Sequence, residues 1–354
     1  MKEFIKGLDL SESFYNECAL PLLREHYPDL RYSAGLIGWG SDVLGYDDEF
    51  STDHNWGPRF YLFLEEGKLD LRPELLDCFR AKLPYEHRGY SVNFMIKENG
   101  EMCLESISEG NVYPMIFVHT LSEYLSQQFG VEDLSDFSRF SPLDWLSYSE
   151  QSLLTLVSGK FYHDGLGLER KLDAIRFYPE NVRLYLIASQ WSIIGEEEAF
   201  VKRCSQVGDE LGSRIVCTRI AERLMRLCFL YKNKYAPYSK WFGTAFRQLS
   251  LDNIHDEITA ALSANTIAER EDHILNAQIL VVELHNTTGI TEPFKIIIDD
   301  YGRNAKIIHT ENFAEMVKDK ITDPELKCCP LIGSTSQIGN IESLWNHLRK
   351  NINS

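Results

Sequence analysis

A phosphate and metal site is predicted by one segment of the sequence, residues 40–56 (GSDVLGYDDEFSTDHNW). Gly40 and Ser41 follow a short apolar stretch that is typical of a strand. Glycine lets a backbone approach a ligand closely, and the hydroxyl and free N–H groups of such a turn can bind a phosphate. Asp53 and Asn55 are two positions apart, so at the start of a strand their side chains would point to the same face. Two oxygen ligands there can hold Mg²⁺ against a triphosphate.

Several residues in and beside this segment have both a chemical and a structural interpretation. Arg59 can bind a phosphate bidentately, or it can form a salt bridge with the acidic spacer before it. His54 can act as a general base, although a structural hydrogen bond is the commoner role. Trp39 and Trp56 can stack on a base or pack in the core. Asp53 itself can brace the loop instead of binding a metal.

The net charge limits the class of partner. The chain has 53 acidic and 36 basic residues, which gives a formal charge of −17. A surface this acidic repels phosphodiester backbones, so no nucleic acid is expected as a partner. A cationic small molecule is favoured electrostatically, although acidity can also serve solubility alone.

Composition and length predict an ordinary cytoplasmic protein. The 354 residues are 44% hydrophobic and 25% charged, which is enough for two domains with their own cores. We expect no membrane association, because no run of about 18 apolar residues occurs and the charged N-terminus lacks the apolar centre of a signal peptide. The eight cysteines form no CxxC pair, so we expect reduced thiols.

Hydrophobic patterns divide the chain into domains 1–135 and 136–354 and predict an α+β protein. In the first domain, alternating strands and helices predict a mixed sheet with flanking helices. Its expected elements are a helix at 10–26, strands at 34–37 and 58–64, a helix at 73–83, a hairpin of 90–97 with 102–107, and a helix at 112–129. The second domain is predicted to be mostly helical, with helices at 142–157, 167–178, 181–206, 209–231, 238–249, 251–264 and 268–287 and a small hairpin within 294–309.

Several motifs resemble known families. Gly40-Ser41, Gly45, Ser51 and Asp53 match the layout of the nucleotidyltransferase superfamily, in which a Gly-Ser turn and a spacer precede paired acidic residues. The strings GYDDEFSTDHNWGPR, SPLDWLSY, FYPENVRLYLIASQW, GDELGS and YAPYSKWFGTAF resemble an uncharacterised family that joins such a domain to a helical domain of unknown function. The resemblance implies Mg²⁺-dependent transfer of a nucleoside monophosphate from a nucleoside triphosphate to a hydroxyl of a small molecule.

By this resemblance, Gly40 and Ser41 hold phosphate, and Asp53 with Asn55 holds the metal. The segment Tyr238-Ser239-Lys240-Trp241 is similar to a Ser-Lys motif of aminoglycoside adenylyltransferases, in which the lysine lies near the nucleotide phosphates. This similarity implies that Lys240 binds phosphate and that the acceptor is a cationic small molecule. A solvated helix lysine is the alternative interpretation of Lys240.

The sequence departs from the superfamily at two places. The second acidic position is Asn55, an amide that brings no charge to a metal. The third carboxylate usual on a neighbouring strand is also missing, because segment 90–96 contains no acid. The acids that could replace it are Glu105, Asp47, Asp48, Glu49, Asp209 and Glu210. Two functions therefore stay open: an active nucleotidyltransferase, and a degenerate module that binds a nucleotide or a protein without chemistry.

Overall fold

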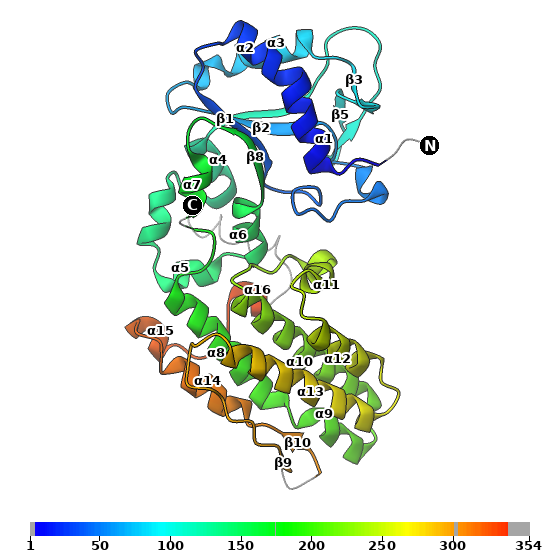
Figure 1. Cartoon of the computed structure of the whole chain (residues 1–354), viewed down its shortest axis with the longest axis vertical. Coiled ribbons are helices and arrows are strands. Elements are labelled where there is room, and N and C mark those ends of the chain that lie inside the picture. The colour runs from blue at the N-terminus through cyan, green and yellow to red at the C-terminus, as the bar shows by residue number, and fades with distance from the viewer. Residues whose placement is uncertain (1–3, 174, 301–303, 339–354) are drawn as a thin grey trace. The chain divides into compact units, whose positions relative to one another are not determined.

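The chain divides into two compact units in a computed structural model that describes residues 4–173, 175–300 and 304–338 (Figure 1). Unit 1 comprises residues 1–139 with 152–176, and unit 2 comprises 140–151 with 177–354. The chain therefore passes between units after residues 139, 151 and 176, whereas the sequence predicted one boundary after 135. The predicted α+β class is confirmed, because unit 1 holds a mixed sheet and helices dominate unit 2.

Unit 1 is built on a four-stranded sheet with the order β7-β2-β1-β8. Its strands are β1 (Tyr32–Ile37), β2 (Arg59–Leu64), β7 (Met115–Thr120) and β8 (Gly159–Asp164). Strand β2 is parallel to β7, while β1 is antiparallel to both β2 and β8. Strand β8 was not predicted, because its residues GKFYHD are mostly polar and lie between predicted helices. The prediction of a helix over 112–129 was wrong in its first half, because the apolar segment before Leu121 forms β7 and only the rest forms a helix.

One face of this sheet carries the apolar core of unit 1. Alternate residues of a strand point to one face, so Phe60, Leu62 and Leu64 all face this core. It is covered by α1 (Gly7–Phe14), a π-helical stretch at Tyr15–Ala19, α2 (Leu20–His26) and α3 (Arg72–Lys82), which Figure 1 shows on the same side of β1 and β2. The predicted helix at 10–26 is thus real, but a π-helical insertion interrupts it.

The other face of the sheet is aromatic. Helix α4 (Leu121–Phe129) begins at the Thr120 cap and ends at Gly130. Its Tyr124 ring lies edge-on to Tyr61 and Phe63, with centroids 5.5 and 5.6 Å away. These ring contacts hold α4 against this face of the sheet. Arg59 lies on the same face, because Arg59 and Tyr61 are two positions apart on β2.

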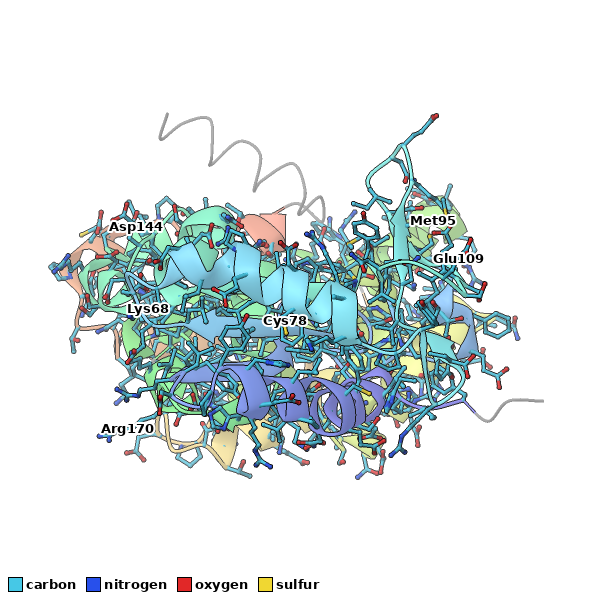
Figure 2. All side chains as sticks on the ribbon, turned by 90° about the horizontal axis from the view of Figure 1, so that it is seen from above. Lys68, Cys78, Met95, Glu109, Asp144 and Arg170 are labelled. Carbon is cyan, nitrogen blue, oxygen red and sulfur yellow. The ribbon has the colours of Figure 1, made fainter. Side chains whose placement is uncertain are left out.

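Short elements complete unit 1. Strand β3 (Glu86–His87) pairs with β4 (Tyr90–Ser91), and β5 (Phe94–Ile96) pairs with β6 (Met102–Leu104). Figure 2 labels Met95 on the β5–β6 hairpin and Cys78 on α3. The remaining elements are the 3₁₀ turns at Glu49–Thr52, Leu69–Leu71 and Leu134–Arg139, and helix α7 (Leu168–Asp173).

Unit 2 packs around α8 (Glu180–Glu197), which is buried along most of its length. Trp191 is fully buried, and its indole N–H donates to the Tyr231 hydroxyl at 2.8 Å. The surrounding elements are α5 (Pro142–Ser147), α9 (Phe200–Arg203), α10 (Glu210–Tyr231), α11 (Ser239–Arg247), α12 (Asp252–Ser263), α13 (Ile267–Asn286), the β9–β10 pair (Asp299–Asp300, Lys306–Ile307), α14 (Thr310–Lys318), α15 (Pro324–Cys328) and α16 (Thr335–Ile338). Helix α6 (Glu150–Val157) begins in unit 2 and ends in unit 1.

Among the helices that the structure describes, none has the length and apolar character needed to cross a bilayer.

A buried carboxyl near the end of α8 should make the stability of unit 2 depend on pH. Glu198 is 6% exposed and accepts hydrogen bonds from the backbone N–H groups of Ile308 and Thr310, both at 3.3 Å. Burial raises the pKa of Glu198 from 4.5 to about 7, against the effect of those two bonds. The folded state therefore takes up a proton at a higher pH than the unfolded state, and this stabilisation is lost as pH rises through about 7.

We expect the unfolding free energy of the wild type, relative to that of Glu198→Gln, to be highest below about pH 4.5. Above pH 7 this relative stability should be lower by up to about 3 kcal/mol, because only the wild type must bury a charged carboxylate. Denaturant unfolding at several pH values measures it. Glu196→Gln, an exposed position on the same helix, is the control and should leave the pH profile unchanged. Parallel profiles for wild type and Glu198→Gln would contradict the assignment.

Candidate functional site

Strand β1 ends in a tight turn, residues 38–41, that requires glycine. Gly38 has φ 89° and Gly40 has φ 134°, a region that side chains with a Cβ rarely adopt. A Cβ on Gly40 would lie 2.1 Å from Oδ1 of Asp42 and 2.5 Å from Nη2 of Arg59. The backbone of the turn is thus packed directly against a charged pair.

That pair, Asp42 with Arg59, is buried and bidentate. The Arg59 Nη2 and Nε atoms donate to the Asp42 carboxylate at 2.8 and 3.1 Å, and the two side chains are 0% and 1% exposed. Nη2 also donates to the Trp39 carbonyl at 2.9 Å, and the guanidinium lies 4.7 Å from the Trp39 ring centroid. Of the two interpretations of Arg59, the salt bridge to the acidic spacer is therefore present, and its partner is Asp42, the first residue of the spacer.

Two buried donors beside the turn have no acceptor among the residues that the structure describes. One is Nη1 of Arg59 and the other is the Tyr124 hydroxyl. The Tyr124 oxygen would be 3.3 Å from a Cβ placed on Gly38, so it lies next to the turn. Burial raises the pKa of Tyr124 well above its ordinary value, so the hydroxyl keeps its proton and stays a donor. An unsatisfied buried donor costs free energy, and an anionic oxygen at the turn would remove that cost.

Ser41 is partly exposed and its hydroxyl has no bonded partner in the described ranges. Its backbone carbonyl accepts from Tyr46, and the Gly40 carbonyl accepts from Leu44, so residues 40–46 close into a compact loop. The predicted phosphate residues Gly40 and Ser41 thus lie together with Arg59 at one end of β1.

The predicted metal residues are arranged differently from the expectation. Strand β2 begins only at Arg59, and Asn55 has a left-handed φ of 51°, so Asp53 and Asn55 do not alternate along a strand. The Asn55 side-chain oxygen accepts a hydrogen bond from the Met102 backbone N–H at 3.0 Å. The backbone N–H of Asn55 donates to the Met102 carbonyl at 2.6 Å. Asn55 therefore braces the β5–β6 hairpin. The physical reason is the left-handed turn at Asn55, which ends any extended run before β2.

Asp53 remains accessible. Its side chain is 67% exposed and bonds Nδ1 of His54 at 2.9 Å, which lowers the pKa of the Asp53 carboxyl. For His54, the hydrogen-bonding interpretation thus has a partner in the structure. Trp56 is 2% exposed and stacks edge-on with Tyr90 at 5.0 Å, so it packs in the core.

Three of the unit 1 carboxylates considered as a third metal ligand have other partners, whereas the fourth, Glu49, is exposed. Asp47 accepts from the Gly7 N–H at 2.7 Å and the Trp56 indole at 3.0 Å. Asp48 caps the 3₁₀ turn that follows it. Glu105 accepts from the Asn93 amide at 3.1 Å.

The unit 2 candidates also have structural partners. Asp209 caps α10, where it accepts from the Gly212 N–H at 2.7 Å, and Glu210 pairs with Arg214 and Arg270. Lys240 is exposed on α11, with its ammonium 4.8 Å from the Trp241 ring. Lys240 belongs to unit 2 and the turn belongs to unit 1.

The side chains that the structure describes do not by themselves form a complete metal site. Within the described ranges, no group of three or more His, Cys, Asp or Glu side chains could hold a metal. Mg²⁺ keeps several waters and is commonly bound by one or two carboxylates together with substrate phosphates. Asp53 can supply one such carboxylate, while a two-metal site lacks its other ligands.

Comparison with known proteins finds similarity over part of the chain. Residues 145–242 match the domain of unknown function DUF4037. This match confirms that a domain of unknown function is present, and it includes β8 of unit 1 together with α8 and α10 of unit 2. The crystal structure of a nucleotidyltransferase-like protein from Exiguobacterium sibiricum 255-15 is similar with a TM-score of 0.32 and 13% identity, over 79% of this chain and 77% of that one. No curated protein matches the chain.

Sequence reasoning did not single out Asp42 or Tyr124 for this turn. The signal for Asp42 was available, because an acid directly after Gly-Ser and an arginine at the start of the next strand can pair. Nothing in the sequence pattern pointed to Tyr124, which reaches the turn only because α4 packs on the aromatic face.

We expect Arg59→Met to cost about 3–5 kcal/mol of unfolding free energy, because the Asp42 carboxylate would stay buried without its partner. Chemical denaturation measures the loss. The double variant Asp42→Leu/Arg59→Met removes both charges and should recover a large part of it.

The exposed pair Arg80–Asp77 is the control, since Arg80→Met should cost about 1 kcal/mol or less. A similar small loss for Arg59→Met would mean that the buried pair does not stabilise the turn.

Proposed function

We propose that unit 1 binds the phosphate groups of a nucleoside triphosphate at the turn 38–41. The observation that carries the proposal is the buried Nη1 of Arg59, which has no acceptor among the described residues and lies beside a glycine turn. A phosphate oxygen is the ligand that suits a guanidinium N–H of this kind. Tyr124 and Ser41 would add neutral donors to the same anion.

Magnesium would enter with the triphosphate. Asp53 would contact the hydrated ion through its exposed carboxylate, whose pKa is lowered by the hydrogen bond to His54. Mg²⁺ bound there would neutralise phosphate charge and orient the phosphates. We assign no metal role to Asn55, because its side-chain oxygen is bonded to Met102.

The reaction that such binding would serve is transfer of a nucleoside monophosphate to a hydroxyl of a small molecule. A cationic acceptor is favoured by the net charge of −17. The second candidate function is nucleotide binding without transfer, as in a sensor. The bracing role of Asn55 and the separate partners of Asp47, Asp48 and Glu105 favour this second function.

Thermal unfolding with ATP or GTP, each with and without Mg²⁺, tests binding. A ligand present at about 100 times its Kd stabilises the folded state by about 2.7 kcal/mol, so the midpoint should rise. Asp53→Ala should abolish the Mg²⁺ dependence, whereas Asp77→Ala, another exposed acid of unit 1, should not. No shift with any nucleotide would overturn the proposal.

Tyr124→Phe gives the sharpest test of the site. Removing an unsatisfied buried hydroxyl should leave the stability of the free protein unchanged or raise it, while lost hydrogen bonding to a charged phosphate should weaken nucleotide binding about tenfold. Titration calorimetry measures the affinity.

Tyr235→Phe removes a similar orphan hydroxyl in unit 2 and should leave nucleotide affinity unchanged. Equal effects of both variants would contradict a role for Tyr124 in binding. Pyrophosphate release with an aminoglycoside as acceptor then separates transfer from binding alone.

A further inference from the structure

Unit 1 contains a cavity of about 410 Å³ at the opposite end of β1 from the turn. Its wall includes Tyr32, the first residue of β1, whereas the turn follows Ile37, the last. A six-residue strand at about 3.3 Å per residue separates the two places by roughly 20 Å. The proposed nucleotide site and this cavity are thus distinct, so a ligand can bind in the cavity whether or not the turn binds a nucleotide.

The charge of the cavity is opposite to that of the protein. Its lining includes Arg24 and His163 but no Asp or Glu, although the chain has 53 acidic residues against 36 basic ones. Arg24 is exposed to solvent at the rim of the cavity, and within the part of the chain that the structure describes its guanidinium has no ion-pair or hydrogen-bond partner. A free guanidinium in a wall without carboxylates attracts an anion.

A buried pair of hydroxyls supplies a further donor. The hydroxyls of Tyr15 and Tyr32 are 2.8 Å apart, and both side chains are buried. One hydroxyl donates its proton to the other. The accepting hydroxyl keeps its own proton, which has no acceptor among the described residues and can be donated to a ligand. The Asn16 amide also lines the cavity and adds two N–H donors.

The walls of the cavity are flat and aromatic. The rings of Tyr32 and His163 lie 4.5 Å apart, and those of Tyr15 and Tyr162 lie 5.8 Å apart. Tyr15 is the first residue of the π-helical stretch, an irregularity that is frequent at functional sites. Both Tyr15 and Asn16 belong to this stretch and line the cavity.

We propose that this cavity is a second binding site, for a small aromatic molecule that carries a carboxylate or phosphate group. Arg24, Asn16 and the spare tyrosine proton would bind the anionic group, and the rings of Tyr162 and His163 would contact the flat body. The cavity volume is within the range of small-molecule sites, about 300–1,000 Å³.

Titration calorimetry of the full chain with benzoate, phenyl phosphate and benzylamine tests the proposal. Benzoate or phenyl phosphate should bind, and the tighter of the two identifies the anionic group, whereas benzylamine should not bind. Arg24→Gln should weaken the binding of the anion about tenfold, because a charge-assisted hydrogen bond is lost. Tyr15→Phe should weaken it by a smaller factor, because it removes one neutral hydroxyl.

Arg31→Gln is the matched control, because Arg31 is exposed, pairs with Glu65 and does not line the cavity. It makes the same charge change and should leave binding unchanged. Ser41→Ala should also leave it unchanged, since Ser41 lies at the other end of β1. Absence of binding by both anions, equal losses in Arg24→Gln and Arg31→Gln, or loss of binding in Ser41→Ala would overturn the proposal.

Discussion

The buried ion pair of Asp42 and Arg59 is the constraint on which the turn after β1 depends. Arg59 starts β2, Asp42 follows the turn, and the guanidinium also contacts Trp39, so one side chain ties three segments together. A glycine is needed at position 40 because the pair occupies the space of a Cβ. The sheet, the loop and the candidate site are therefore organised by a single desolvated charge interaction.

Much of this arrangement follows from local pattern, and some does not. Apolar and aromatic content correctly indicated β1 and β2, which are buried at every position. Helical periodicity of apolar residues correctly indicated the helical character of unit 2. Strand β8 left no such signal, since it is a polar edge strand whose partner β1 is far away in sequence. The left-handed conformation of Asn55 could not be predicted either, because asparagine is a common residue both in turns and as a metal ligand.

Some residues of the candidate site could be located from the sequence, and others could not. Gly40 and Ser41 could be located from the sequence because a glycine turn between two strands has a recognisable pattern. Tyr124 could not, because its position depends on how α4 packs against aromatic rings of β2. The same limit applies to the cavity near Tyr15, whose wall includes residues of a π-helical stretch that the helical pattern of the sequence does not reveal.

The pairing of β8 with β1 has a consequence for synthesis. Strand β1 emerges from the ribosome early, but its edge partner is made only after residues 140–151, which already belong to unit 2. Until residue 164 has emerged, the exposed edge of β1 has no cover and can pair with other chains. Closing such a long loop is also entropically slow. The nascent chain therefore passes through a stage in which the β1 edge of unit 1 is open to misassembly.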